Sequence, residues 1–293
     1  MTEIQGAGVA LVTPFNADGS VDFETLGNLI EFQIQEGMDY LVSLGTTGET
    51  ATLSSEEKKK IWKFTKEKVN GRLPLVAGIG GNHTQEIVEA IKNFETEGYC
   101  AILSVSPYYN KPTQEGIYQH YKVVAQASSL PIILYNVPGR TGSNMSAQTT
   151  LRLANDFKNI VAIKEASGNF AQFSEILRDK PTDFLLISGD DPATLPMMAL
   201  GAVGIISVVG NAYPKYVSTL AKLCTSGNYV EARTIHNKLL KITDLCFTES
   251  NPCGVKYILE ELGFGKDHVR LPLVPITDHT RDKIKQEILV LKD

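Results

Sequence analysis

Eight short apolar runs, separated by stretches of helical periodicity, constrain the fold of this chain more than any other feature. Each run is rich in Val, Ile and Leu and apolar on both alternating faces, which is typical of a parallel strand covered on two sides. The runs occupy residues 8–14, 40–46, 73–80, 100–107, 131–137, 160–166, 183–189 and 203–209. The stretches between them carry helix start signals: a capping box of Ser54 and Glu57, and Thr84 and Thr113 ahead of amphipathic segments. Strands and helices therefore alternate without a break.

The number of runs and their spacing favour a closed barrel over an open sheet. Eight strands, each followed by a helix, match a (β/α)8 TIM barrel better than a doubly wound sheet. No further strand pattern follows residue 212, and the remaining segments have helical periodicity. We therefore predict an α/β fold with a barrel core at residues 1–211 and a barrel-closing, C-terminal helical extension at residues 212–293. In such a barrel, the active site lies at the C-terminal ends of the strands.

Charge, hydropathy and cysteine content argue against several kinds of partner. The chain has 28 Lys and Arg against 33 Asp and Glu, and no basic stripe that would neutralise a nucleic-acid backbone. No apolar stretch reaches the roughly 20 residues that span a bilayer, and the N-terminus lacks the basic region of a secretory signal. The four widely spaced cysteines suit neither a disulfide framework nor a paired-cysteine zinc site. We expect a cytoplasmic protein with no nucleic-acid or membrane partner.

Metal, dinucleotide and hydrolase motifs are also missing. The five histidines form neither H-x-H nor H-E-x-x-H, so we expect no metal site. The glycine-rich stretch at residues 78–83 resembles a dinucleotide fingerprint, but His83 stands where its last glycine should be. No P-loop and no G-x-S-x-G motif occurs.

A lysine near the end of the sixth run is the strongest candidate for a catalytic group. Period-2 alternation places Lys164 on one face with Ala162, and Val161 and Ile163 on the other. An inward lysine at this end of a barrel is desolvated, which favours the neutral amine that attacks a carbonyl to form a Schiff base. The alternative is a strand-end lysine whose ammonium reaches solvent.

Other strand ends carry side chains that suit such chemistry. Tyr135 lies near the end of the fifth run and can relay protons, and Arg140 follows a Pro-Gly turn and can hold a carboxylate. Thr46 and Thr47 lie at the end of the second run, between two glycines, in a turn that can bind an anion. Gly189 ends the seventh run and leaves room at the barrel mouth. Taken singly, these residues could equally be a core tyrosine, a surface arginine, a helix cap and a turn glycine.

The ordered set of motifs resembles one known group of enzymes across essentially the whole chain. The motifs are GTTGE at 45–49, SPYYNKPTQEG at 106–116, YNVPGRTG at 135–142, IKEASG at 163–168, SGDD at 188–191 and GIISVVGN at 204–211. This set is similar to the Schiff-base pyruvate aldolases of the N-acetylneuraminate lyase superfamily and, within it, to the dihydrodipicolinate synthase family.

The resemblance implies a reaction and the groups that perform it. Lys164 would form a Schiff base with pyruvate, whose enamine would attack aspartate 4-semialdehyde to give 4-hydroxytetrahydrodipicolinate, on the diaminopimelate route to lysine. Tyr135 would relay protons, and Thr46 and Tyr109 would complete a hydroxyl chain to solvent. Tyr109 would come from the neighbouring subunit of a tight dimer, two of which form a homotetramer. No external cofactor would be needed.

The resemblance also implies how the substrates are held. Thr46 and Thr47 would bind the carboxylate of pyruvate, and Gly189 and Ile206 would line the pocket near the lysine. Arg140 would bind the carboxylate of aspartate 4-semialdehyde.

A regulatory site is implied as well, with two departures from the family pattern. Family members that lysine inhibits often carry histidines where this chain has Ser55 and Lys58, whereas Asn82, Glu86 and Tyr108 match the site. We therefore predict weak or no inhibition by lysine.

Two other functions stay open at this point. A sister aldolase that cleaves sugar acids, such as N-acetylneuraminate lyase, would share the Schiff-base chemistry, although Arg140 argues against it. A non-catalytic barrel that binds a keto acid would keep Thr46 and Thr47 but would need neither Lys164 nor the hydroxyl chain.

Overall fold

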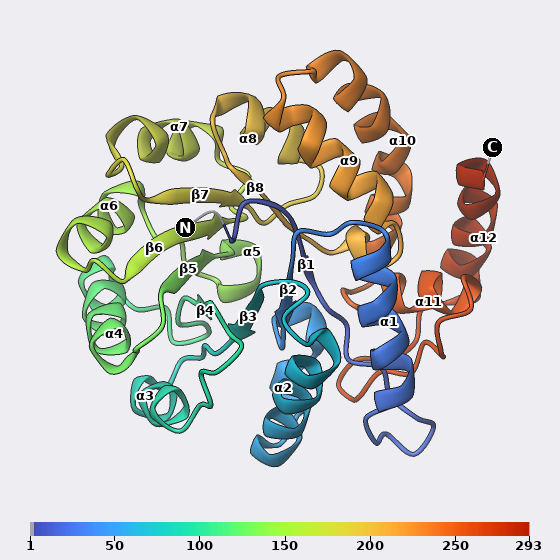
Figure 1. The fold of residues 1–293 in the computed structure, drawn as a ribbon, viewed down its shortest axis with the longest axis horizontal. Coiled ribbons are helices and arrows are strands. Elements are labelled where there is room, and N and C mark those ends of the chain that lie inside the picture. Colours follow the sequence, from blue (N-terminus) through green and yellow to red (C-terminus); the bar gives the residue numbers. More distant parts are fainter. Residues whose placement is uncertain (1–2, 293) are drawn as a thin grey trace.

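The computed structural model of the chain describes residues 3–292, in which eight parallel strands close into a barrel (Figure 1). Each strand pairs with its neighbours in chain order, and β8 closes the ring against β1. The strands are β1 Gly6–Ala10, β2 Tyr40–Ser43, β3 Leu75–Gly78, β4 Ala101–Val105, β5 Ile132–Asn136, β6 Ile160–Glu165, β7 Leu185–Ser188 and β8 Gly204–Ser207. The predicted TIM barrel is confirmed, with strands shorter than the apolar runs that marked them.

Helices cover the outside of the barrel between successive strands (Figure 1). They are α1 Phe23–Gln35, α2 Ser55–Val69, α3 Thr84–Lys92, α4 Gln114–Ala127, α6 Ala147–Asp156, α7 Phe170–Asp179, α8 Thr194–Leu200 and α9 Pro214–Thr225. The capping box of Ser54 and Glu57 and the Thr113 cap form as predicted. At α3 the prediction was wrong. The side chain of His83 caps the helix, accepting the Glu86 N–H, and Thr84 is its first residue.

The last part of the chain is helical, as predicted. It contains α10 Tyr229–Phe247, α11 Cys253–Glu261 and α12 Asp278–Lys292, which lie together on one side of the barrel (Figure 1). Helix α9 packs against β1 and β8, and α10 packs against α8, α9, α11 and α12. The domain division at residue 211 stays a proposal.

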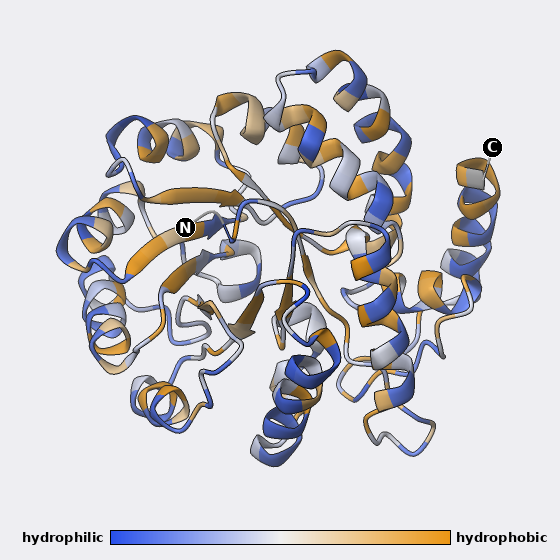
Figure 2. Ribbon diagram, viewed as in Figure 1, coloured by the Kyte–Doolittle hydropathy of each residue, from blue (hydrophilic) through white to orange (hydrophobic). Residues whose placement is uncertain are grey.

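The apolar residues form two layers, one inside the barrel and one between the strands and the helices. Figure 2 shows the apolar strands and the polar outer faces of the helices. Lys164 follows the interior residue Ala162 by two positions, as expected. Val161 also packs in the interior cluster, although we expected it on the outer face. A register shift at Ile132 and Ile133 causes this, because it leaves Val161 as an extra residue in β6.

Among residues 3–292, no helix combines the length and the apolar character that crossing a membrane requires.

Candidate active site

Lys164 lies at the C-terminal end of β6, and only 4% of its surface is exposed. Its Nζ atom is 4.3 Å from the centre of the Tyr135 ring, and no carboxylate of residues 3–292 lies within 4.0 Å of it. Burial lowers the pKa of Lys164 to about 8; the Asp191 carboxylate raises the pKa, and the Arg140 charge lowers it. At pH 7, about one lysine in ten is then the neutral amine, far more than for an exposed lysine. The structure thus holds an amine with nucleophilic character at the barrel mouth.

The end of β7 makes room for this lysine. A Cβ atom at Gly189 would lie 2.9 Å from both Cγ and Cε of Lys164, closer than packed atoms come. The N–H of Gly189 donates to the carbonyl of Glu165 over 2.8 Å, which fixes β7 beside β6. Ile206 on β8 is fully buried in the interior cluster that also contains Tyr135. A larger residue at position 189 would therefore displace Lys164, and the role of Gly189 and Ile206 in lining a pyruvate pocket stays a prediction.

Tyr135 and Thr46 form the next part of the site. Tyr135 is the penultimate residue of β5 and pairs with Lys164 in the strand register. Burial raises the pKa of Tyr135, and the Arg140 charge and a hydrogen bond with Thr46 lower it. Thr46 begins a short 3-10 helix, η1 Thr46–Gly48. The tyrosine hydroxyl therefore stays protonated and can pass protons between Lys164 and the threonine.

Thr47 is buried in the same turn and has a partner that sequence analysis missed. The Nδ2 atom of Asn251 donates to its hydroxyl oxygen over 3.0 Å, across 204 positions of the chain. The Thr13 hydroxyl donates to the carbonyl of Gly48 over 2.8 Å and holds the turn against the end of β1. No local signal in the sequence could have found Asn251, because the contact forms only when the C-terminal helices fold onto the barrel.

Asp191 is a second residue that sequence analysis left without a role. It is buried after β7, where its carboxylate accepts hydrogen bonds from the Ser207 hydroxyl and the Val208 N–H. Its negative charge favours the protonated form of Lys164. The SGDD motif contained the residue, but its burial beside Lys164 is visible only in the structure.

Arg140 and Tyr109 lie near the mouth on two connecting segments. We call residues 138–146, which contain the single-turn helix α5 Pro138–Thr141, the Arg140 loop, and residues 106–113, between β4 and α4, the Tyr109 loop. Arg140 is in α5 and forms no ion pair with any described residue. Tyr109 is 89% exposed, and its N–H donates to the carbonyl of Thr141 over 3.2 Å. The chain thus ties the Tyr109 loop to the Arg140 loop but leaves the Tyr109 ring outside its own site.

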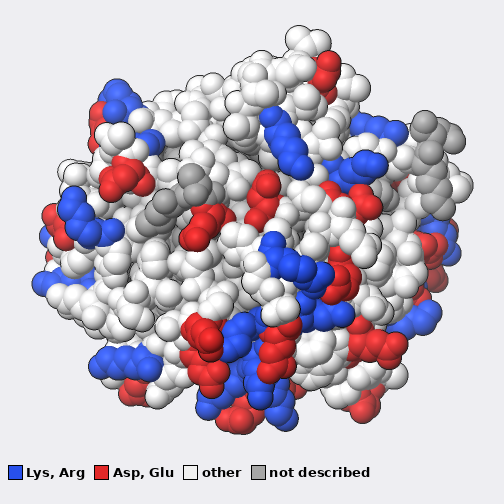
Figure 3. All heavy atoms as spheres, in the orientation of Figure 1, with Lys and Arg blue, Asp and Glu red and all other residues white. Residues whose placement is uncertain are grey.

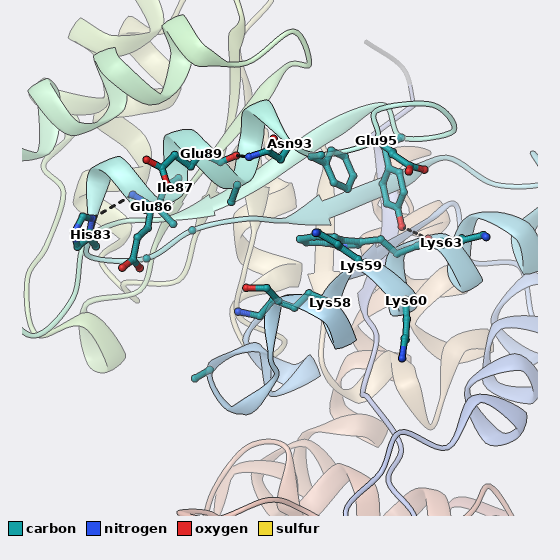
Figure 4. Close-up of a pocket in the computed structure, with 18 of the residues that line it drawn as sticks. Lys58, Lys59, Lys60, Lys63, His83, Glu86, Ile87, Glu89, Asn93 and Glu95 are labelled. Atoms are coloured by element: carbon teal, nitrogen blue, oxygen red, sulfur yellow. Dashed lines mark hydrogen bonds between the residues drawn. The ribbon is translucent and has the colours of Figure 1, made fainter.

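The five predicted regulatory residues lie together in a separate cavity of about 870 Å³ between α2 and α3, lined by Ser55, Lys58, Asn82, Glu86 and Tyr108. Figure 4 shows Lys58 on α2 across this cavity from Glu86 on α3. Burial lowers the pKa of the half-buried Lys58, and the Glu86 charge raises it. Figure 3 shows basic side chains gathered over α2 with acidic ones on both sides. The cavity therefore contains a cation of the chain's own.

No group of three or more His, Cys, Asp and Glu side chains among residues 3–292 could hold a metal ion.

The fold and the buried lysine at its mouth are typical of TIM-barrel lyases of the class I aldolase type, which use a lysine as the nucleophile. The chain belongs to the dihydrodipicolinate synthetase family, whose sequence model matches residues 3–290. This confirms the predicted family and enzyme class.

Individual relatives are similar over nearly their whole length. The chain is 54% identical over 283 residues to 4-hydroxy-tetrahydrodipicolinate synthase of Parabacteroides distasonis, covering 97% of this chain and 95% of that one. It is 52% identical over 291 residues to the Phocaeicola vulgatus enzyme of the same name, covering 99% and 98%. The crystal structure of dihydrodipicolinate synthase from Aquifex aeolicus superposes with a TM-score of 0.96 at 42% identity, covering 99% and 98%.

Proposed function

We propose that Lys164 condenses pyruvate with L-aspartate 4-semialdehyde through a Schiff base. The product is 4-hydroxytetrahydrodipicolinate, and the chain is a lyase of the diaminopimelate route to lysine. The observation that carries the assignment of Lys164 is its burial beside Tyr135 with no acidic partner within 4.0 Å among residues 3–292.

The reaction follows from the placement of these groups. The neutral Nζ of Lys164 attacks the keto carbon of pyruvate, and the carbonyl oxygen takes up protons and leaves as water. The resulting iminium withdraws electrons, so the methyl group loses a proton and an enamine forms. The enamine carbon then bonds to the aldehyde carbon of the second substrate, whose oxygen takes up a proton and becomes the 4-hydroxyl group. The amino group of the semialdehyde attacks the re-formed iminium carbon, closes the ring and displaces the Lys164 amine, which frees the product. Tyr135 relays the protons through Thr46, and no step requires an external cofactor.

The two carboxylates of the substrates are bound by different parts of the mouth. The hydroxyls of Thr46 and Thr47 bind the carboxylate of pyruvate, and Gly189 and Ile206 line the pocket beside it. Arg140 binds the carboxylate of the semialdehyde, and its free guanidinium supports this role. A sister aldolase acting on sugar acids would not need this charge.

A coupled assay separates these functions. Purified enzyme is given pyruvate with either aspartate 4-semialdehyde or a panel of sugar-acid aldehydes, and pyruvate consumption is followed. We expect turnover with the semialdehyde only. Preference for a sugar-type aldehyde would refute the substrate assignment, and binding of pyruvate without turnover would favour a keto-acid-binding protein.

We also propose that Tyr109 completes the site of a second subunit in a homodimer or homotetramer. Its 89% exposure in this chain supports this role. Mixing Tyr109→Phe subunits with Lys164→Ala subunits should restore activity, because one kind of site in the mixed dimer has both native residues. A fully active monomer in sedimentation would contradict the proposal.

The regulatory cavity and the cellular location complete the proposal. Lys58 occupies the cavity with a charge of the same sign as a lysine ligand, so lysine inhibits weakly or not at all. The cytoplasm is the proposed location, and the four unpaired cysteines support a reducing compartment.

A further inference from the structure

Glu165 is a buried carboxylate that the proposed reaction does not use. It follows Lys164 in β6 and is fully buried; since successive strand residues face opposite sides, it points away from the barrel interior. Both of its oxygens accept hydrogen bonds from Nδ2 of Asn136, at 3.0 and 3.1 Å. The N–H of Ser167 donates to one oxygen over 2.9 Å, and Nε2 of Gln172 donates to the other over 2.8 Å. Every one of these partners is a donor, as an ionised carboxylate requires.

Backbone groups fix the direction of this network. The N–H of Met145 donates to Oδ1 of Asn136 over 3.0 Å, so the amide nitrogen of Asn136 must face Glu165. The carbonyl of Met145 accepts from Nε2 of Gln172 over 3.1 Å, which orients that amide in the same way. No basic side chain of the described residues lies within 4.0 Å of the carboxylate. Burial raises the pKa of Glu165, and the hydrogen bonds from these neutral amides lower it, so the amides favour the charged form of the carboxylate.

This hydrogen-bond network connects β6, which carries Lys164, to the Arg140 loop. Residues 142–146 connect α5, which carries Arg140, to α6. In this loop, Oδ1 of Asn144 accepts from Asn136 over 2.8 Å, and its Nδ2 donates to Gln172 over 2.9 Å. Asn136 and Glu165 are in turn the residues after Tyr135 and Lys164, and they pair in the strand register. The loop end thus bonds directly to β5 and α7, and Asn136 and Gln172 connect it to Glu165 of β6.

We propose that Glu165 is a positioning residue that fixes the Arg140 loop relative to Lys164, and so determines selectivity for an aldehyde substrate that carries a carboxylate. The inference rests on the proposed function, because it assumes that Lys164 and Arg140 each bind one substrate. Glu165 acts through geometry, since its side chain faces away from the mouth and its oxygens contact only the network. A loss of the network leaves the pocket for pyruvate in place and releases the loop that holds the second substrate.

The first test is Glu165→Gln, which keeps the size of the side chain and places an N–H group against the donors that surround it. We expect KM for aspartate 4-semialdehyde to rise about 10- to 100-fold, because hydrogen bonds to a charged group are lost. KM for pyruvate and the rate of borohydride trapping should stay within about threefold of the native values. The matched control is Glu175→Gln, an exposed carboxylate on the same helix as Gln172, which should change neither KM.

The second test is Asn144→Ala, which removes an exposed side chain of the loop and leaves the pair of Glu165 and Asn136 intact. We expect KM for the semialdehyde to rise about 2- to 10-fold, with KM for pyruvate unchanged. This variant decides the question if Glu165→Gln does not fold. Equal effects on both substrates, or none in either variant, would overturn the proposal. Absence of a pyruvate adduct at Lys164 in the native enzyme would instead refute the proposed function.

Discussion

Two lysines of this chain are buried to the same extent and have different environments. Lys164 at the barrel mouth is 4% exposed, and Lys256 on α11 is 2% exposed. The Lys256 ammonium forms an ion pair with Glu49, donates to the carbonyl of His268 over 2.8 Å and lies 4.2 Å from the centre of the Phe15 ring. The Lys164 ammonium contacts the Tyr135 ring and has no carboxylate of residues 3–292 within 4.0 Å, so Asp191 acts on it only from a longer distance. A buried lysine without an ion-paired carboxylate loses its proton more readily than one that has such a partner.

The paired lysine supports the site from a distance. Its partner Glu49 ends the GTTGE turn in a left-handed conformation, with φ of 53°. Burial lowers the pKa of Lys256, and the charge of Glu49 raises it. The same carboxylate accepts the N–H of Arg270 over 3.1 Å. The C-terminal helices thus hold the turn that carries Thr46 and Thr47, so Lys256 has a structural role, whereas Lys164 is the lysine that we propose to be reactive.

Removal of each lysine should separate these roles, and the largest effect is expected at Lys164. Lys164→Ala should lower turnover by at least about 1,000-fold, because the covalent intermediate can no longer form. Its thermal unfolding should resemble that of the native protein, since the variant removes a charge that forms no ion pair within 4.0 Å among the described residues. Substantial residual turnover would contradict the comparison.

Lys256→Met should affect stability instead. It leaves Glu49 buried without its cation, which costs about 3 to 5 kcal/mol in the free energy of unfolding. The control is Lys59→Met, since the exposed pair of Lys59 and Glu56 contributes at most about 1 kcal/mol. Chemical denaturation measures both values. If the two variants were equally stable, Lys256 would not have the structural role that we assign to it.

A smaller and more selective effect is expected from Arg140→Ala. It removes the cation that binds the semialdehyde, so kcat/KM for this substrate should fall about 10- to 150-fold. Pyruvate binding should change much less. Steady-state kinetics with each substrate varied in turn gives both numbers. Equal losses for the two substrates would show that Arg140 does not determine specificity.

The smallest effect is expected from added lysine. The charge of Lys58 should weaken lysine binding by about 1 kcal/mol, or about fivefold, at a separation of roughly 4 Å in water. A dose-response curve at half-saturating substrate measures this, and Lys58→His should increase the sensitivity. Strong inhibition of the native enzyme well below millimolar lysine would mean that Asn82, Glu86 and Tyr108 suffice for binding.

The fold could be predicted because its main signal is local. Each buried strand is a continuous apolar run, so all eight strands were found. The boundaries were less accurate, as at the first run, predicted at residues 8–14 and observed at Gly6–Ala10. The residues just beyond this strand are apolar and buried, but they lie in a loop. There, the Val12 N–H donates to Oδ1 of Asn211 over 3.0 Å. An apolar run in the sequence indicates that its residues are buried, but it cannot distinguish a strand from a buried loop.

The site was predictable only in part, for the same reason. Lys164, Tyr135 and Thr46 stand at strand ends, where the barrel topology alone brings them together. The pair of Lys256 and Glu49 spans 207 positions of the chain. No periodicity or local motif encodes such a contact. The sequence therefore indicated the candidate catalytic residues but not the residues that hold them in place, such as Lys256 and Asn251.

Borohydride trapping with pyruvate, with the adduct located by peptide mass across a pH series, tests the central claim most directly. We predict one modified residue, Lys164, and none at Lys256. With the pKa of Lys164 at about 8, the neutral fraction and the initial rate should rise about tenfold from pH 6 to 7 and level off above pH 8. A rate that keeps rising toward pH 10 would contradict the lowered pKa. An adduct at another lysine, or no adduct, would contradict the account as a whole.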